Sequence, residues 1–131
     1  MKIGIVEMGG DLHKVFQAEL SGKIETAEFQ VKKALDLFDV LAYSRRLISS
    51  DQLVVIVKFS EEEPELKSVF LHGLATLEEE TGKNIFKCFY YEDEDAEAKV
   101  KELAETFFNY LFHPEKLEKK EEPKEEFTLP I

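Results

Sequence analysis

The chain has 131 residues, 44% of them hydrophobic, and carries 28 acidic against 17 basic residues for a net charge of −11. This length suits one domain, and so much apolar content argues against a disordered chain. The negative surface repels nucleic acids and anionic membranes, and no apolar run approaches the ~20 residues of a membrane-spanning helix. We therefore expect one soluble, cytoplasmic domain with no nucleic-acid or membrane partner.

Cys88 is the chain's one cysteine, so an intramolecular disulfide is impossible, which suits a reducing cytoplasm. It lies in the apolar run 85–89, which favours a buried structural thiol over a catalytic nucleophile. The many Glu and Lys residues are typical of proteins from hot environments, where networks of ion pairs become cheaper to form. We expect a thermophilic source.

The first predicted elements are a short strand and a helix. The β-rich run 1–6 leads into a turn signal at Gly9-Gly10-Asp11. Apolar residues then recur at helical spacing from Leu12 to Leu20, and Ser21-Gly22 supplies a stop, which predicts a helix over about 11–21.

Residues 24–48 allow two interpretations. Ala27, Phe29 and Val31 alternate with polar residues, which indicates a half-buried strand near 25–32 and a helix near 36–49. One long helix is the alternative, because neither Gly nor Pro interrupts the segment. We favour the first interpretation, since a helix of about 25 residues is unusually long.

The rest of the chain continues the alternation. The unbroken apolar run 53–57 is typical of a central parallel strand buried on both faces. A helix over about 62–81 follows, opened by Ser60 as a cap, then a strand over 84–90 and a helix over 95–112 that ends before His113-Pro114. Glu78 and its two acidic neighbours read as a solvated helical face.

This order predicts an α/β fold: a three-layer sandwich with a four-stranded parallel, flavodoxin-like sheet and helices on both faces. The single domain spans 1–117, and 118–131 form a charged, flexible tail. The apolar tip of that tail, 127–131, is either a frayed end or a segment that docks into a groove of this or a neighbouring subunit.

Ligands of such sheets lie beyond the carboxyl ends of the strands. Gly9 and Gly10 follow the first strand and suit either a turn that needs backbone freedom or a phosphate site. Glu92 and Asp93 suit a cation or a base, although acids at a helix start also satisfy the helix dipole. His72, beside a helical glycine, reads as a packed or surface histidine or as a site residue facing another subunit.

With these elements in place, four segments resemble the lumazine synthase/archaeal riboflavin synthase family. Residues 39–48 are similar to that family's second helix, with an acid at the start and a basic pair before Leu-Ile. Residues 73–86 resemble its third helix running through Glu-Thr-Gly into the fourth strand. Residues 91–94 and 110–117 are similar to the archaeal enzymes' acidic segment and to the end of their last helix.

The resemblance implies a homo-oligomeric ring in which two 6,7-dimethyl-8-ribityllumazine molecules dismutate to riboflavin between subunits. It implies no metal and no tightly bound cofactor. The stacked rings would need aromatic and apolar walls, for which Phe29, Phe59 and Tyr91 are candidates, with Ser60 at the same strand end. His72 would be the candidate for proton transfer, and Glu92 or Asp93 the second choice.

The loops that would face the ligand, 8–12 and 58–62, depart from the family's pattern. Two other functions therefore stay open. One is a non-catalytic oligomeric protein-interaction module of the same fold. The other is an unrelated flavodoxin-like domain that binds a nucleotide or flavin at its strand ends. Phe38, Leu41, Phe70 and Leu74 suit either a subunit interface or the core.

Overall fold

Strands and helices alternate from residue 2 to residue 112 of the computed structural model, which describes residues 1–60 and 64–118. The elements are β1 Lys2–Met8, α1 His13–Ser21, β2 Glu28–Lys33, α2 Leu37–Leu47, β3 Gln52–Lys58, α3 Pro64–Thr81, β4 Ile85–Tyr90, α4 Ala96–Phe112 and α5 Pro114–Glu118. The predicted order βαβαβαβα is confirmed.

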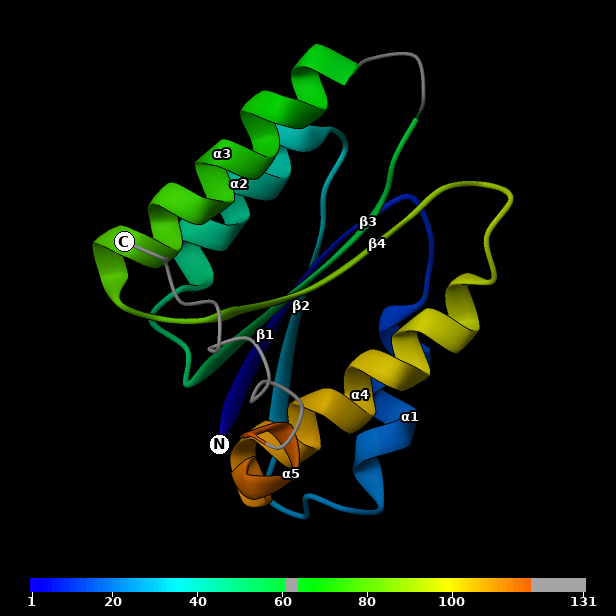
Figure 1. Cartoon of the computed structure of the whole chain (residues 1–131), viewed down its shortest axis with the longest axis vertical. Helices are drawn as coiled ribbons and strands as arrows, with labels where there is room; N and C mark the ends of the chain where they lie inside the picture. Colours follow the sequence, from blue (N-terminus) through cyan, green and yellow to red (C-terminus); the bar gives the residue numbers. More distant parts are fainter. Residues whose placement is uncertain (61–63, 119–131) are drawn as a thin grey trace, which may run out of the picture.

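The four strands form one sheet in the order β2-β1-β3-β4, and every neighbouring pair is parallel. Helices α2 and α3 cover one face of this sheet, and α1 and α4 cover the other (Figure 1). The predicted three-layer, flavodoxin-like α/β fold is therefore confirmed. All four carboxyl ends meet at one edge, called the carboxyl edge, where ligands of such sheets bind.

Each face of the sheet has its own hydrophobic core. Val54 and Ile56 of β3 point into the core beneath α1 and α4, where Phe16 and Phe107 meet edge to face with ring centroids 5.4 Å apart. Val55 and Val57 point into the core beneath α2 and α3. Because successive side chains of a strand point to opposite faces, a strand buried on both must be apolar throughout. This explains the unbroken run in β3.

Residues 24–48 form a strand and a helix, so the interpretation as one long helix is wrong. The side chain of Asp36 accepts a hydrogen bond from the backbone N–H of Asp39 (2.8 Å) and caps α2 at its first turn. A carboxylate in this position satisfies one of the helix's unpaired N–H groups. The strand β2 ends at Lys33, and this cap starts the helix three residues later.

Two details differ from the sequence prediction. The short helix α5 was not predicted, because five residues are too few to show a helical spacing of apolar side chains. Glu78 is not simply solvated: its carboxylate accepts a hydrogen bond from the N–H of Ile85 (2.8 Å) and pairs with Lys87 (2.9 Å). The acidic cap expected at residues 61–63 and the tail at 119–131 lie outside the described residues.

In the parts of the chain that the structure covers, no helix combines the length and the apolar character required to cross a bilayer.

Ser44 of α2 is a buried polar residue whose hydroxyl has no hydrogen-bond partner among the described residues. Leaving a buried hydroxyl unpaired costs about 1–3 kcal/mol, and Ala is the better helix former. We predict that Ser44→Ala raises the free energy of unfolding by about 1 kcal/mol in urea titrations. As a control, Ser21→Ala at an exposed helix end should change it little, and a loss of stability in Ser44→Ala would contradict the prediction.

Candidate functional site

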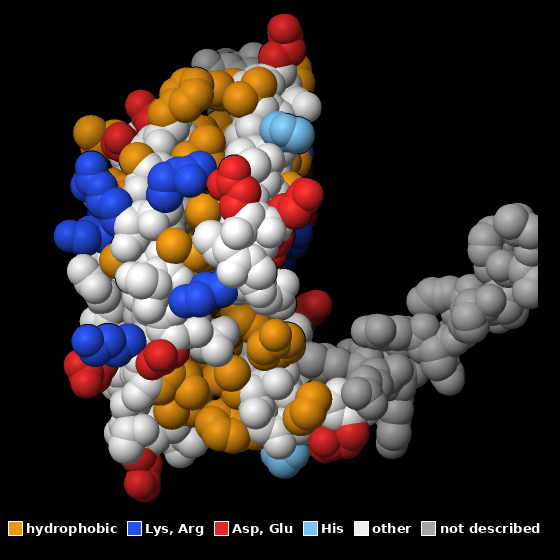
Figure 2. Space-filling model, turned by 90° about the vertical axis from the view of Figure 1, so that its left-hand side faces the viewer, with side chains coloured by type: hydrophobic (Ala, Val, Ile, Leu, Met, Phe, Trp, Pro, Cys, Tyr) orange, Lys and Arg blue, Asp and Glu red, His pale blue; other side chains and the backbone are white. Residues whose placement is uncertain are grey.

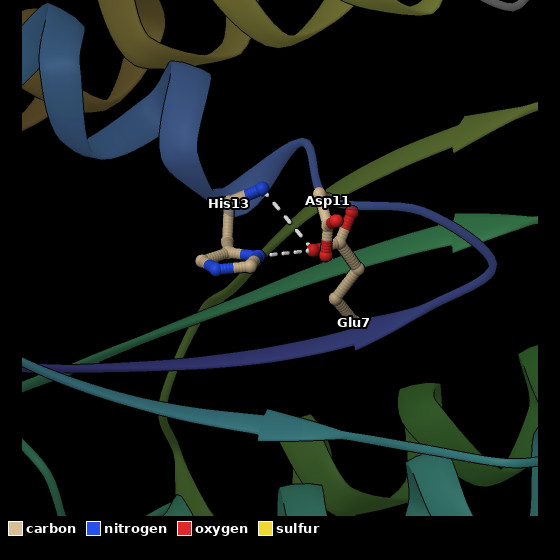
Figure 3. Close-up of side chains that lie close together, drawn as sticks. All are labelled: Glu7, Asp11 and His13. Carbon is tan, nitrogen blue, oxygen red and sulfur yellow. Dashed lines mark hydrogen bonds and ion pairs between the residues drawn. The ribbon is translucent and has the colours of Figure 1, made fainter.

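Glu7 lies at the end of β1, is completely buried, and points toward the start of α1 (Figure 3). Its carboxylate accepts hydrogen bonds from the backbone N–H groups of Leu12 (2.7 Å) and His13 (3.1 Å). The ring of His13 lies 2.6 Å away through Nδ1, which donates because an ionised carboxylate only accepts. Since no side chain at the N-cap position binds the helix, Glu7 caps α1 from the sheet.

Lys33 at the end of β2 provides the positive charge of this cluster. Its ammonium lies 3.0 Å from Asp11 Oδ1 and 3.5 Å from Glu7 Oε1, and it donates to the carbonyl oxygen of Gly10. Glu7 and Lys33 are neighbours in the parallel register, so both side chains point to the same face of the sheet. The hydrogen bond and charge of Lys33, with the charge of Lys14, hold the pKa of Asp11 below its usual value.

Glu7, Asp11 and His13 each offer one metal-ligand atom, and these three atoms lie within 4.8 Å of one another. The cluster already contains a cation, because the ammonium of Lys33 contacts both carboxylates. A metal ion would have to displace that ammonium and break the bond between Glu7 and His13. The arrangement therefore acts as a structural ion-pair cluster that joins β1, α1 and β2.

The glycine pair lies at the crevice between β1 and β3, which is the topological switch point of the sheet. Gly9 has φ +95°, and a Cβ atom there would lie 2.7 Å from Cβ of Lys58, so this position needs glycine. A Cβ on Gly10 would lie 3.0 Å from the hydroxyl of Tyr90, a tight contact. These features favour the interpretation of the pair as a turn that needs backbone freedom rather than as a phosphate site. Burial and then the charge of Glu7 raise the pKa of Tyr90.

An open cavity of about 490 Å³ lies one strand further along, where β3 and β4 end. It is lined by Ser60, Pro64, Lys67, Tyr91, Asp93 and Glu94, and is called the aromatic cavity. Tyr91 packs against Phe59 with ring centroids 6.0 Å apart, and Phe89 extends this aromatic cluster behind Phe59 at 5.1 Å. The ring of Tyr91, a hydroxyl, an ammonium and carboxylates thus meet at one place on the carboxyl edge.

The acidic residues that follow β4 make different contacts. Asp95 accepts from the N–H of Ala98 (3.1 Å) and caps α4, as expected for an acid at a helix start. Glu94 accepts from the N–H of Tyr91 and pairs with Lys99, and these two bonds, Lys99 first, lower the pKa of Glu94. Glu92 pairs with Lys58 (2.6 Å). Asp93 is exposed and lines the aromatic cavity.

The structure brings together only part of the site that the sequence suggested. Ser60, Tyr91 and Asp93 line the aromatic cavity, with Glu92 close in sequence, and Gly9 and Gly10 lie at the adjacent strand ends. Phe59 packs against Tyr91 but is buried in the core and does not line the cavity. His72 is exposed on α3 and does not line this cavity. Phe29 lies opposite Ile3, near the amino ends of the strands, and packs on the core beneath α1 and α4.

Cys88 is buried, as expected, and burial raises the pKa of its thiol to about 11. A thiol with such a pKa is almost entirely protonated at neutral pH and is a poor nucleophile. Its side chain borders a separate groove between β4 and α4. Cys88 is therefore a buried structural residue rather than a catalytic nucleophile.

Sequence reasoning missed Glu7, His13 and Lys33 as a cluster, and it missed Lys67. One signal was present: Glu7 continues the inward positions of Ile3 and Ile5 in β1, where a charged residue requires a buried partner. The identity of that partner depends on strand register, which the sequence does not display. Lys67 carried no comparable signal, because lysine on a helix is ordinarily a surface residue.

A scan against models of known protein families gives no match, and a search of curated protein sequences gives no significant match.

We predict that Glu7→Gln lowers the free energy of unfolding by about 2–3 kcal/mol, because the amide cannot accept from three donors as the carboxylate does. Chemical denaturation followed by circular dichroism measures this change. The matched control is Glu92→Gln, whose partner pair is largely exposed, and which should lie within about 0.5 kcal/mol of the parent. Equal effects of the two substitutions would rule out the proposed role of Glu7.

Proposed function

We propose that the chain is a divergent member of the lumazine synthase/archaeal riboflavin synthase family that binds ribityllumazine or riboflavin. The ligand would lie in the aromatic cavity, at the boundary with a neighbouring subunit. The observation that carries the proposal is the composition of this cavity, in which Tyr91 supplies ring surface beside the polar groups of Ser60 and Asp93, while the buried ring of Phe59 supports Tyr91 from behind. Fold alone would not support this proposal, since one fold serves many functions.

The chemistry of a ribityl heterocycle matches these groups. Its flat ring system stacks on an aromatic side chain, here Tyr91, which is half-buried. Its hydroxylated chain needs donors and acceptors, which Ser60 and Asp93 offer at the mouth of the cavity. The volume of about 490 Å³ lies in the range of small-molecule sites.

A phosphate group is not favoured at this edge. The N–H groups at the start of α1, where flavodoxin-like folds bind phosphate, already donate to Glu7. The net charge of −11 and the carboxylates of Asp93 and Glu94 also repel an anion. These features support riboflavin or its lumazine precursor over a nucleotide or a phosphorylated flavin.

Binding without turnover is the form of the proposal that we favour. None of the chain's three histidines is among the described residues that line the aromatic cavity. The loops at 8–12 and 58–60 also differ from the family's ligand-facing segments. We further propose a cytoplasmic location, which suits a lone free cysteine.

Self-association is favoured by a separate observation, an apolar surface where α2 and α3 begin. Leu35, Phe38 and Val69 are 90%, 59% and 56% exposed, and Figure 2 shows hydrophobic side chains gathered at the upper end of this side of the molecule. Leu41 of α2 faces Gly73 of α3, since a Cβ on Gly73 would lie 2.9 Å from its methyl groups. Phe38 and Val69 lie one turn earlier on the same two helix faces. This surface would meet a second copy of the chain.

We predict that the protein binds riboflavin and 6,7-dimethyl-8-ribityllumazine, and that it binds riboflavin 5′-phosphate less tightly. Quenching of the ligands' fluorescence measures the three affinities. Tyr91→Ala should weaken riboflavin binding by about five- to tenfold, the range of an aromatic stacking contact. Tyr110→Ala is the control, because Tyr110 lies among residues at the opposite end of the strands, beside Asn84.

Absence of binding by any ribityl compound would refute this function. If riboflavin forms from the lumazine over hours and His72→Ala stops its formation, the protein is an enzyme and the binding-only form of the proposal is wrong.

A further prediction concerns the self-association of the chain. Phe38→Glu should shift the protein toward the monomer in sedimentation velocity experiments, because a charge replaces apolar surface that a second copy would cover. Glu79→Gln on the exposed side of α3 should leave the assembly unchanged. A monomeric parent protein at high concentration would exclude self-association through this surface.

A further inference from the structure

The strand β4 forms one edge of the sheet, since it pairs with β3 alone among the described strands. Its sequence, Ile-Phe-Lys-Cys-Phe-Tyr, contains a single charged residue, Lys87. The other edge strand, β2, carries Glu28, Lys32 and Lys33, and charges of this kind keep an edge from pairing with further chain. An apolar edge without such protection is a place where an extended segment adds to a sheet.

The backbone groups that face this edge belong to alternate residues of β4. The carbonyl oxygen of Tyr90 accepts a hydrogen bond from the N–H of Phe59 (2.8 Å), so the backbone of Tyr90 faces β3. Successive residues of a parallel strand bond to opposite neighbours, so Lys87 and Phe89 face away from β3. The N–H of Ile85 faces the same way and donates to a side chain of α3. No described residue pairs with the outward backbone groups of Lys87 and Phe89.

A groove of about 380 Å³ lies beside this edge, between β4 and α4. Cys88 of β4 and Leu103 and Thr106 of α4 supply apolar surface to it. The residues of β4 that bond to β3, such as Tyr90, place their side chains on this α4 face of the sheet. All strands of a parallel sheet share one orientation, so a parallel strand outside β4 would follow the same rule. Its residues that bond to β4 would therefore place their side chains in the groove.

We propose that residues 127–131 of this chain add to β4 as a fifth parallel strand and fill this groove. Apolar side chains occupy every second position of the segment, at Phe127, Leu129 and Ile131. In the proposed register these residues bond to β4 and also lie beneath α4. Pro130 belongs to the alternate set, whose backbone faces outward, so its missing N–H removes no bond to β4. The inference is independent of the ligand proposed above.

The chain that precedes this segment is long enough to reach the edge. Near the end of α4, Tyr110 packs against Phe86 of β4 with ring centroids 5.1 Å apart, and α5 follows directly. Residues 119–126 separate α5 from the apolar segment, and extended chain of this length spans up to about 26 Å. The strand β4 itself extends over about 20 Å. A segment that enters at the amino end of β4 runs in the same direction as β4, as a parallel strand must.

Hydrogen exchange of the full chain, followed by NMR, tests the inference. The amides of Lys87 and Phe89 should be protected in the parent, and Leu129→Asp should speed their exchange by about tenfold or more, since it removes one buried leucine. Thr128→Asp should leave both rates unchanged, because this neighbouring side chain would not enter the groove. The amide of Cys88, which faces β3, should stay protected in both variants and reports that the sheet is intact. Equal exchange of Lys87 and Phe89 in the parent and in Leu129→Asp would refute the inference.

Nuclear Overhauser contacts then define the direction of the segment and the chain that supplies it. The methyl groups of Leu129 should lie close to those of Leu103 and Thr106. Contacts of Leu129 with the α3 face of β4 would indicate antiparallel addition and would overturn the inference. Contacts that arise between labelled and unlabelled chains in a mixed sample would show that a second copy supplies the segment, which would equally overturn it.

Discussion

The buried carboxylate of Glu7 is the interaction on which the carboxyl edge depends. Removing a charge from water costs several kcal/mol unless partners replace its hydration, and here α1, His13 and Lys33 supply them. The same bonds orient α1 on β1 and hold the end of β2 beside the loop at Gly10. One side chain thus joins three elements, and without it the N–H groups of Leu12 and His13 would lose their acceptor.

This cluster also decides where a ligand can bind. Glu7 uses the N–H groups of α1 that would otherwise attract an anion, and Gly9 lets the loop pack directly on Lys58 across the switch point. At the crevice that serves flavodoxin-like folds, the N–H groups of Leu12 and His13 are therefore already occupied. A cavity lies instead at the ends of β3 and β4, where the ring of Tyr91 meets polar and charged side chains.

The side chains of that cavity favour a neutral, hydroxylated ring system over an anion. Asp93 and Glu94 line it together with Tyr91, whose hydroxyl accepts a hydrogen bond from the ammonium of Lys67. The exposed residues Leu35 and Phe38 lie at the start of α2, so self-association and ligand binding would use neighbouring parts of the molecule.

The sequence by itself determined the elements, because periodicity, caps and turns are local properties: the unbroken run of β3, the cap at Asp95 and the burial of Cys88 were all readable from neighbouring residues. Only the tertiary structure decided the site. Phe29 and Phe59 looked equivalent as wall residues, yet strand register places one near the amino ends and the other at the carboxyl edge. The partners of Glu7 and the hydrogen bond from Lys67 to the hydroxyl of Tyr91 likewise arise from contacts between distant segments, which no local pattern encodes.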